Sequence, residues 1–371
     1  MNSERLSPLQ IALLLLLVPL IACSYYYPHL IYRMGTRGWW VTIVASDAVI
    51  YGLVWVWLRL AQEWPQGTLV GVVTAGWGRL SGALILLPVA VPLWLSGIIT
   101  IRELAVLMTD SLLPHTAIGV IFLVGLVTAW YIAYLGVKGI AHYTEVILIL
   151  IALPLMVVLY GLAAENVKLI FLAPWWWIPD HLGVTGVMEL PLAFSGLLAL
   201  PTLLPYVDST HQLKSGVGWA LMAGTLVLLA GVAGPLGTLG PAAAEATPLP
   251  SLMFFNAAAT AILFVQQLSY AMVTLWVVIF VGAAAFALWA SARAASEMLG
   301  QPRITGTLGI LVGLGWGINQ AMPTIVQLRQ IIALDGILTS VGLIWIVVWA
   351  IPLYILAKHH RREGGHHAPP S

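Results

Sequence analysis

The sequence predicts an all-α integral membrane protein with about ten helices crossing a bilayer. Of the 371 residues, 61% are hydrophobic and only 8% are charged, whereas soluble globular proteins carry roughly 25% charged residues. The mean hydropathy is +0.98, and apolar runs recur from Ile11 to Leu356. These runs are continuous, as membrane helices require, and lack the alternation in segments of about ten residues that is typical of a membrane β-barrel.

The expected spans follow the apolar runs, because a helix needs about 20 residues to cross a hydrocarbon core of ~30 Å. In chain order they are Pro8–Tyr32, Trp39–Leu60, Leu80–Met108, His115–Leu135, Thr144–Leu162, Val187–Tyr206, Gly218–Leu239, Ala258–Ala292, Thr305–Gln320 and Ile332–Leu356. One permease-like domain, residues 1–358, therefore contains all the spans. The polar segment 359–371 is expected to be a disordered tail.

The basic residues predict the side of the membrane that the termini face. An even number of spans places both termini on one side. The expected terminal side holds Arg5, Arg59, Arg79, Lys138, Lys214, Arg293, Arg303, Lys358, Arg361 and Arg362, and the other side holds Arg33, Arg37, Arg102, Lys168 and Arg329. Basic residues are concentrated in cytoplasmic loops, so both termini are expected in the cytoplasm.

The tryptophans and the single cysteine exclude some kinds of site. Many of the 17 tryptophans lie near expected span ends, at Trp39–Trp40, Trp55–Trp57 and Trp175–Trp177, which favours interfacial anchoring over an aromatic ligand cage. The lone Cys23 excludes an internal disulfide and a cysteine-rich metal site. Cys23 also ends a pattern resembling a bacterial lipoprotein signal, but the apolar run continues to Ile31 without a polar linker, which favours an uncleaved span.

The charged residues within the expected spans include Asp47, Arg102 and Glu103, and a charge at such a position is costly and is usually functional or paired. Asp47, in the second span, is expected to be either a proton or cation site or a buried, hydrogen-bonded acid. Arg102 and Glu103 are adjacent in the third span and point about 100° apart, so we do not expect them to pair with each other. Arg102 is expected to meet either another helix or a substrate carboxylate.

The first and sixth spans contain residues that interrupt helices. Pro19 and Pro28 lie in the first, and the sixth contains Pro191, Gly196 and Pro201. Proline removes a backbone donor and clashes with the preceding turn. In transporters built from two inverted repeats, discontinuous helices hold substrate and ions near the membrane midplane. Interruptions in spans one and six therefore predict a LeuT-like 5+5 inverted repeat.

Several short motifs occur in a distinctive order. They are Leu6-Ser-Pro-Leu-Gln10, Arg37-Gly-Trp-Trp40, Leu58-Arg-Leu-Ala61, Pro65-Gln-Gly-Thr-Leu69, Arg102-Glu-Leu104, Gly136-Val-Lys-Gly-Ile-Ala-His-Tyr-Thr-Glu145 and Leu203-Leu-Pro-Tyr-Val207. Over essentially the whole chain these motifs resemble the spore-germination permease family, the membrane-embedded B subunits of bacterial spore germinant receptors. The chain departs from the family pattern where Ile21 and Cys23 replace glycines and where Phe194-Ser-Gly196 lacks the usual acid.

The resemblance implies a fold of the amino acid–polyamine–organocation type in the inner membrane of the spore. It implies a pocket for a small nutrient, commonly an amino acid, and assembly with a receptor A subunit and a C-subunit lipoprotein. Family members are thought to sense germinants rather than pump them. Because no nucleophile, metal-ligand or phosphate-binding pattern occurs, we expect neither an enzyme nor a cofactor, and the net charge of +1 gives no indication of nucleic-acid binding.

The ligand is expected between the first, third, sixth and eighth spans. Backbone N–H groups at the half-helix starts would hold a ligand carboxylate, because helix N-termini carry partial positive charge. The expected ligand-binding residues are Ala22, Cys23, Ser24, Phe194, Ser195 and Gly196, with Tyr270 and Trp289 as candidates for an apolar wall. Two alternatives stay open, an ion-coupled amino acid transporter with Asp47 as the coupling site and a membrane scaffold without a ligand.

Overall fold

The computed structural model describes residues 5–24, 26–34, 38–62, 69–173, 188–247, 249–258, 268–301, 303–320 and 325–364, and its described part is helical. The α-helices are α1 (Pro8–Ala22), α2 (Tyr27–Met34), α3 (Trp39–Ala61), α4 (Leu69–Ser111), α5 (Ile118–Tyr134), α6 (Gly136–Glu145), α7 (Leu153–Ala164), α9 (Leu200–Leu203), α10 (Thr210–Leu239), α11 (Pro241–Ala246), α12 (Pro250–Ala258), α13 (Leu268–Met298), α14 (Ile304–Gln320) and α15 (Ile325–Gly364). A π-helix, η1 (Val146–Ala152), joins α6 to α7, and 3₁₀ segments form η2 (Leu169–Leu172), η3 (Leu190–Ala199) and η4 (Leu204–Tyr206).

Each expected span corresponds to one helix or to one chain of helical segments. Six described helices are long and apolar enough to cross a membrane, or seven if the bent pair α1 and α2 is one span, and shorter apolar helices cover Ile118–Tyr134 and Leu190–Tyr206. The described part of the eighth span is α13, which covers Leu268–Met298, and residues 259–267 lie outside the described residues. The helix α15 extends beyond its expected limits to cover Ile325–Gly364. Arg37 and Trp175–Trp177 lie outside the described residues.

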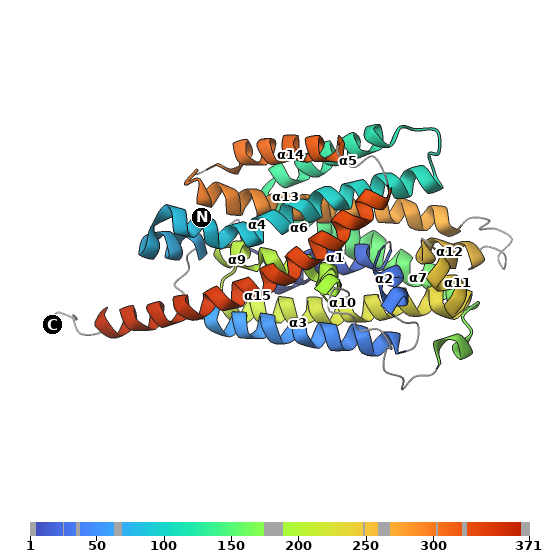
Figure 1. Ribbon diagram of the computed structural model, residues 1–371, viewed down its shortest axis with the longest axis horizontal. Helices are drawn as coiled ribbons and strands as arrows, with labels where there is room; N and C mark the ends of the chain where they lie inside the picture. Colours follow the sequence, from blue (N-terminus) through green and yellow to red (C-terminus); the bar gives the residue numbers. More distant parts are fainter. Residues whose placement is uncertain are drawn as a thin grey trace.

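The helices run roughly along the long axis of the molecule, with α3 and α10 along one edge and α5 and α14 along the other (Figure 1). The helices α1, α4 and α13 form the core between these edges. Ile279–Ala292 of α13 is buried throughout, whereas α5 exposes a face of large apolar side chains. A helix that is apolar on all sides is stable only when it is enclosed by protein or lipid, so the outer helices supply the lipid-facing surface.

The first span is interrupted between α1 and α2, whose axes differ by 58°. The interruption follows from local sequence, because Pro19 lies inside α1 and Pro28 lies in the first turn of α2, where proline's missing N–H has no helical partner. The sixth span is also irregular, since η3 is a 3₁₀-helix and Phe194 has the non-helical angles φ −122° and ψ 25°. Both interruptions predicted from the sequence are therefore present.

Three of the family-like motifs meet at the N-terminal end of α1. Gln10 completes a capping box with Ser7 and donates from Nε2 to Glu145 Oε2 at 3.0 Å. Lys138 donates to Gln10 Oε1 at 3.1 Å and to the carbonyl of Arg5 at 2.7 Å. Arg5 in turn pairs with Asp208, and Leu6 N–H donates to the carbonyl of Tyr206. We call Arg5, Gln10, Lys138, Glu145 and Asp208 the N-terminal network.

Some of the basic residues expected on the terminal side lie together at this end. Lys138, Arg293 and Arg303 line one surface pocket there together with Tyr206 and Trp289. The end of α15 lies toward the same end of the bundle as the start of α1 (Figure 1). Both ends of the described chain thus lie toward the same end of the helix bundle.

Candidate functional site

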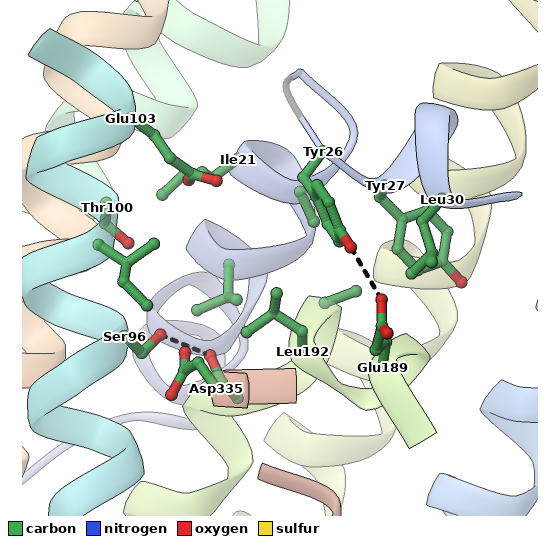
Figure 2. A pocket seen from close by; sticks show the side chains of 15 residues that line it. Ile21, Tyr26, Tyr27, Leu30, Ser96, Thr100, Glu103, Glu189, Leu192 and Asp335 are labelled. Atoms are coloured by element: carbon green, nitrogen blue, oxygen red, sulfur yellow. Dashed lines mark hydrogen bonds between the residues drawn. The ribbon is translucent and has the colours of Figure 1, made fainter. Parts of the chain in front are cut away.

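A small cavity lies between the two interrupted spans and two continuous helices. Its lining comes from α1, α2 and the segment joining them, from α4, from the start of the sixth span and from α15. The lining residues are Val18, Ile21, Ala22, Tyr26, Tyr27, Leu30, Ser96, Ile99, Thr100, Glu103, Glu189, Leu192, Ala193, Ser195 and Asp335. Figure 2 shows their side chains converging from these elements. The fourth wall is therefore α15, the tenth span, instead of the expected eighth span.

The cavity is small in this conformation. Its volume is about 40 Å³, which is room for a few water molecules because each needs roughly 10–15 Å³. Pockets that enclose drug-sized ligands measure about 300–1,000 Å³. A ligand larger than a few waters would therefore fit only if the surrounding helices or side chains moved apart.

Polar side chains hold the two interrupted spans to each other and to α4. Tyr26, in the interruption of the first span, donates its hydroxyl to Glu189 Oε2 at 2.8 Å at the start of the sixth. The hydroxyl oxygens of Ser96 on α4 and Ser195 on η3 lie 3.0 Å apart and are hydrogen-bonded. Both contacts are drawn in Figure 2. Movement of either half-helix would therefore break or exchange these hydrogen bonds.

Asp335 is a second buried acid in the cavity lining, in addition to Glu103. Asp335 is fully buried, and neither of its carboxylate oxygens has a hydrogen-bond partner among the described residues. The neighbouring Gly336 lets α15 approach the sixth span, because a Cβ there would lie 2.9 Å from the Cα of Glu189 and 3.0 Å from its carbonyl oxygen. Close backbone contact thus places Asp335 at the interrupted part of the sixth span.

The peptide groups at the interruption of the first span are largely engaged within the protein. The carbonyl of Cys23 accepts from the Ser251 hydroxyl at 2.7 Å, and the carbonyl of Ile21 accepts from the Ser24 hydroxyl at 2.6 Å. The Cys23 thiol donates to the carbonyl of Leu20. Cys23 and Ser24 therefore stabilise the interruption and do not line the cavity. Of the three residues expected here, Ala22 alone lines it.

Of the three ligand-binding residues expected in the sixth span, one lines the cavity and two do not. Ser195 lines the cavity, whereas Phe194 and Gly196 are buried outside its lining. A Cβ on Gly196 would lie 3.2 Å from Cγ2 of Val18, so this glycine permits packing between η3 and α1. A large side chain at Gly196 would consequently disturb helix packing before it reached the cavity.

The two aromatic residues proposed as a wall lie away from the cavity. Tyr270, at the start of α13, is 41% exposed. Trp289 is buried against Tyr206 and Phe286 and lines the surface pocket at the other end of the helix bundle. These positions follow from the packing of α13, which contacts α4 and α5 extensively and contributes no residue to the cavity lining.

The three charged residues considered within the expected spans lie at different places in the structure. Glu103 lines the cavity, whereas Arg102 points to α14 and donates to Asn319 Oδ1 at 3.0 Å. The two side chains therefore diverge as expected, and Arg102 makes a helix-to-helix contact. Asp47 is buried in a separate groove between α3 and α10, which Lys214 also lines.

Sequence analysis missed most of the polar lining, including Tyr26, Ser96, Thr100, Glu189 and Asp335. The signal for Asp335 is the same one that identified Asp47, an acidic residue within an apolar run. Its position was obscured because the tenth span was expected to begin at Ile332, which placed the acid near a span end. The helix begins at Ile325, so Asp335 lies well inside it.

Comparisons with known proteins agree with this geometry. The structure superposes on that of Mhp1, a nucleobase-cation-symport-1 family transporter solved in a closed conformation with bromovinylhydantoin bound. The TM-score is 0.64 at 12% identity, over 97% of this chain and 94% of that one, which confirms the predicted transporter fold with interrupted first and sixth spans. The search of curated proteins finds no match. A family model described as "Spore germination protein" matches residues 5–315, and the chain therefore belongs to this spore permease family.

Proposed function

We propose that this protein is the nutrient-sensing membrane subunit of a spore germinant receptor, and that its nutrient is an amino acid bound between the interrupted spans. The observation that carries the proposal is the cavity enclosed by both interruptions, α4 and α15. Family membership supports the receptor role. It also supports a location in the inner membrane of the spore with cytoplasmic termini.

The small volume of the cavity suggests how nutrient binding would change the conformation of the protein. Because its volume of about 40 Å³ is too small for an amino acid, ligand binding must favour a more open arrangement of the helices. A ligand shifts such an equilibrium by its difference in affinity for the two states. The Tyr26–Glu189 and Ser96–Ser195 hydrogen bonds join the parts that would separate. The receptor A subunit and the C-subunit lipoprotein would respond to that change.

The polar lining offers a test that leaves helix packing largely intact. Thr100→Val removes a hydroxyl from the cavity with little change in volume, and Thr128→Val makes the same change at an exposed position of α5. If Thr100 bonds the nutrient, spores carrying Thr100→Val should need about 5–10 times more nutrient to germinate, since one hydrogen bond contributes about 1 kcal/mol. Thr128→Val spores should respond like wild type.

Receptor abundance must be equal in these spores, which an immunoblot of spore membranes measures. Ser195→Leu, which fills the cavity, provides a second and larger perturbation. Wild-type sensitivity in both Thr100→Val and Ser195→Leu spores, at equal abundance, would rule out this cavity as the nutrient site.

An ion-coupled amino acid transporter is the second candidate, and the fold shared with a cation symporter favours it. Purified protein reconstituted into vesicles distinguishes the two. Uptake of an amino acid against its gradient, driven by an imposed ion gradient, would favour transport. Nutrient binding without such uptake would favour sensing.

A further inference from the structure

The polar lining of the cavity is acidic and consists of oxygen atoms. Three carboxylates, those of Glu103, Glu189 and Asp335, line it together with the hydroxyls of tyrosine, serine and threonine. None of its lining residues, all within the described chain, is Lys, Arg or His. The cavity is therefore built to face positive charge, whereas the sequence favoured backbone groups that hold a ligand carboxylate.

Asp335 is the lining residue that most clearly needs a positively charged partner. Its carboxylate is fully buried, and both oxygens lack hydrogen-bond partners among the described residues. Removing an ion from water without a partner is strongly unfavourable. The other buried acid in this situation, Asp47, shares its groove with the basic Lys214. Asp335 shares its cavity with no basic side chain among the described residues, so an ionised Asp335 would need a positive charge from outside the described structure.

We propose that Asp335 binds a small monovalent cation in this cavity, either an inorganic ion or the primary ammonium group of the nutrient. The ammonium case rests on the proposed function, and the inorganic case does not. The linked hydroxyls of Ser96 and Ser195 supply further oxygen ligands from the same lining. In Figure 2, Asp335 lies toward the end of the cavity that contains Ser96, with Glu103 toward the other end.

Size and ligand chemistry both favour a monovalent ion. The volume of about 40 Å³ admits an ion with one or two waters, given roughly 10–15 Å³ per water. Carboxylate and hydroxyl oxygens suit hard cations, but Ca²⁺ takes about 6–8 oxygen ligands. The described residues contain no group of three or more His, Cys, Asp or Glu arranged to hold a metal ion. Of the lining carboxylates, Asp335 is the one with both oxygens unpartnered among the described residues, and this one carboxylate with the hydroxyls of Ser96 and Ser195 matches one positive charge.

The test measures thermal stability of the purified full-length protein in detergent as salt is varied. Sodium, potassium, ammonium and methylammonium chloride are each titrated against choline chloride at constant ionic strength. Wild type is compared with Asp335→Asn, which keeps the shape and removes the charge. Asp110→Asn, at an exposed acid near the end of α4, is the matched control.

We expect at least one small cation to raise the melting temperature of wild type and Asp110→Asn saturably and to leave Asp335→Asn unchanged. A rise with sodium or potassium identifies an inorganic ion site, and a rise confined to ammonium and methylammonium identifies an amine site. Where Asp335→Asn does not yield folded protein, Ser96→Ala should increase the half-saturating concentration several-fold. An equal rise in all variants, or no rise with any salt, overturns the proposal.

The proposed function and this inference can fail separately. A flat salt titration removes the cation site and leaves the response of Thr100→Val and Ser195→Leu spores as the test of the nutrient cavity. Conversely, if a cation raises the melting temperature of wild type and not of Asp335→Asn, the cation site is supported even when those spores germinate normally.

Discussion

The two ends of α1 handle polar groups in opposite ways. In the N-terminal network, Gln10, Lys138 and Glu145 contact one another, and Arg5 pairs with Asp208. At the other end, α1 leads into a cavity where Asp335 has no partner for either carboxylate oxygen within the described structure. A satisfied network holds helices together, whereas an unsatisfied buried acid calls for a further partner, which for Asp335 is the proposed cation.

This comparison predicts that acids at the two ends respond differently to substitution. Breaking a satisfied network leaves its remaining members unpaired and lowers stability. Neutralising an unpartnered buried acid removes a desolvation cost and leaves no orphaned partner. The close helix contacts around the cavity should be sensitive to added volume.

The largest effect is expected for Gly336→Leu, which inserts a side chain where α15 meets the backbone of Glu189. Overpacking of this kind costs about 1–3 kcal/mol and can cost more. The control is Gly313→Leu on α14, because a Cβ at Gly313 meets nothing within 4 Å. Thermal unfolding of the two purified variants compares them directly. Equal melting temperatures would show that the contact between α15 and the sixth span is not tight.

The second effect is the loss of Glu145 from the N-terminal network. Glu145→Ala leaves Gln10 Nε2 without its acceptor, and a hydrogen bond to a charged group contributes about 1.5–3 kcal/mol. Glu165→Ala removes an exposed acid just after α7 and should have little effect. The measurement is again thermal unfolding, and a Glu145→Ala melting temperature matching that of Glu165→Ala would contradict a stabilising network.

The smallest effect is expected for Asp335→Asn in choline buffer, where no small cation is present. The melting temperature should equal or exceed that of wild type, because the substitution leaves no partner unpaired and relieves any cost of a buried charge. This contrasts with the loss expected for Glu145→Ala. A marked decrease in stability would show that Asp335 has a structural partner and would remove the distinction between the two ends of α1.

The sequence predicted the membrane fold well because its signals are local or strongly repeated. Apolar runs identified the spans, and Pro19 and Pro28 marked the interruption in the first. The order of several short motifs predicted family membership. For the first of them the structure adds a physical reason, since Gln10 caps α1 and joins it to Glu145.

The site was predicted only in part because it depends on packing between distant segments. Ala22 and Ser195, which were expected to bind the ligand, line the cavity together with Glu103, which was expected to be an ion or ion-pair residue. Cys23 and Ser24 instead use their polar groups within the chain. Nothing local indicates that α15 rather than α13 closes the cavity. That choice depends on close approach at Gly336, which sequence alone does not reveal.

The most direct test of the central claim asks whether filling the cavity abolishes nutrient binding. Melting temperatures of purified wild type, Ser195→Leu and Thr128→Leu are measured across a panel of amino acids, with Thr128 providing an exposed position on α5. An amino acid that raises the melting temperature of wild type and Thr128→Leu should leave that of folded Ser195→Leu unchanged. The same rise in all three proteins would place the nutrient elsewhere and contradict the account.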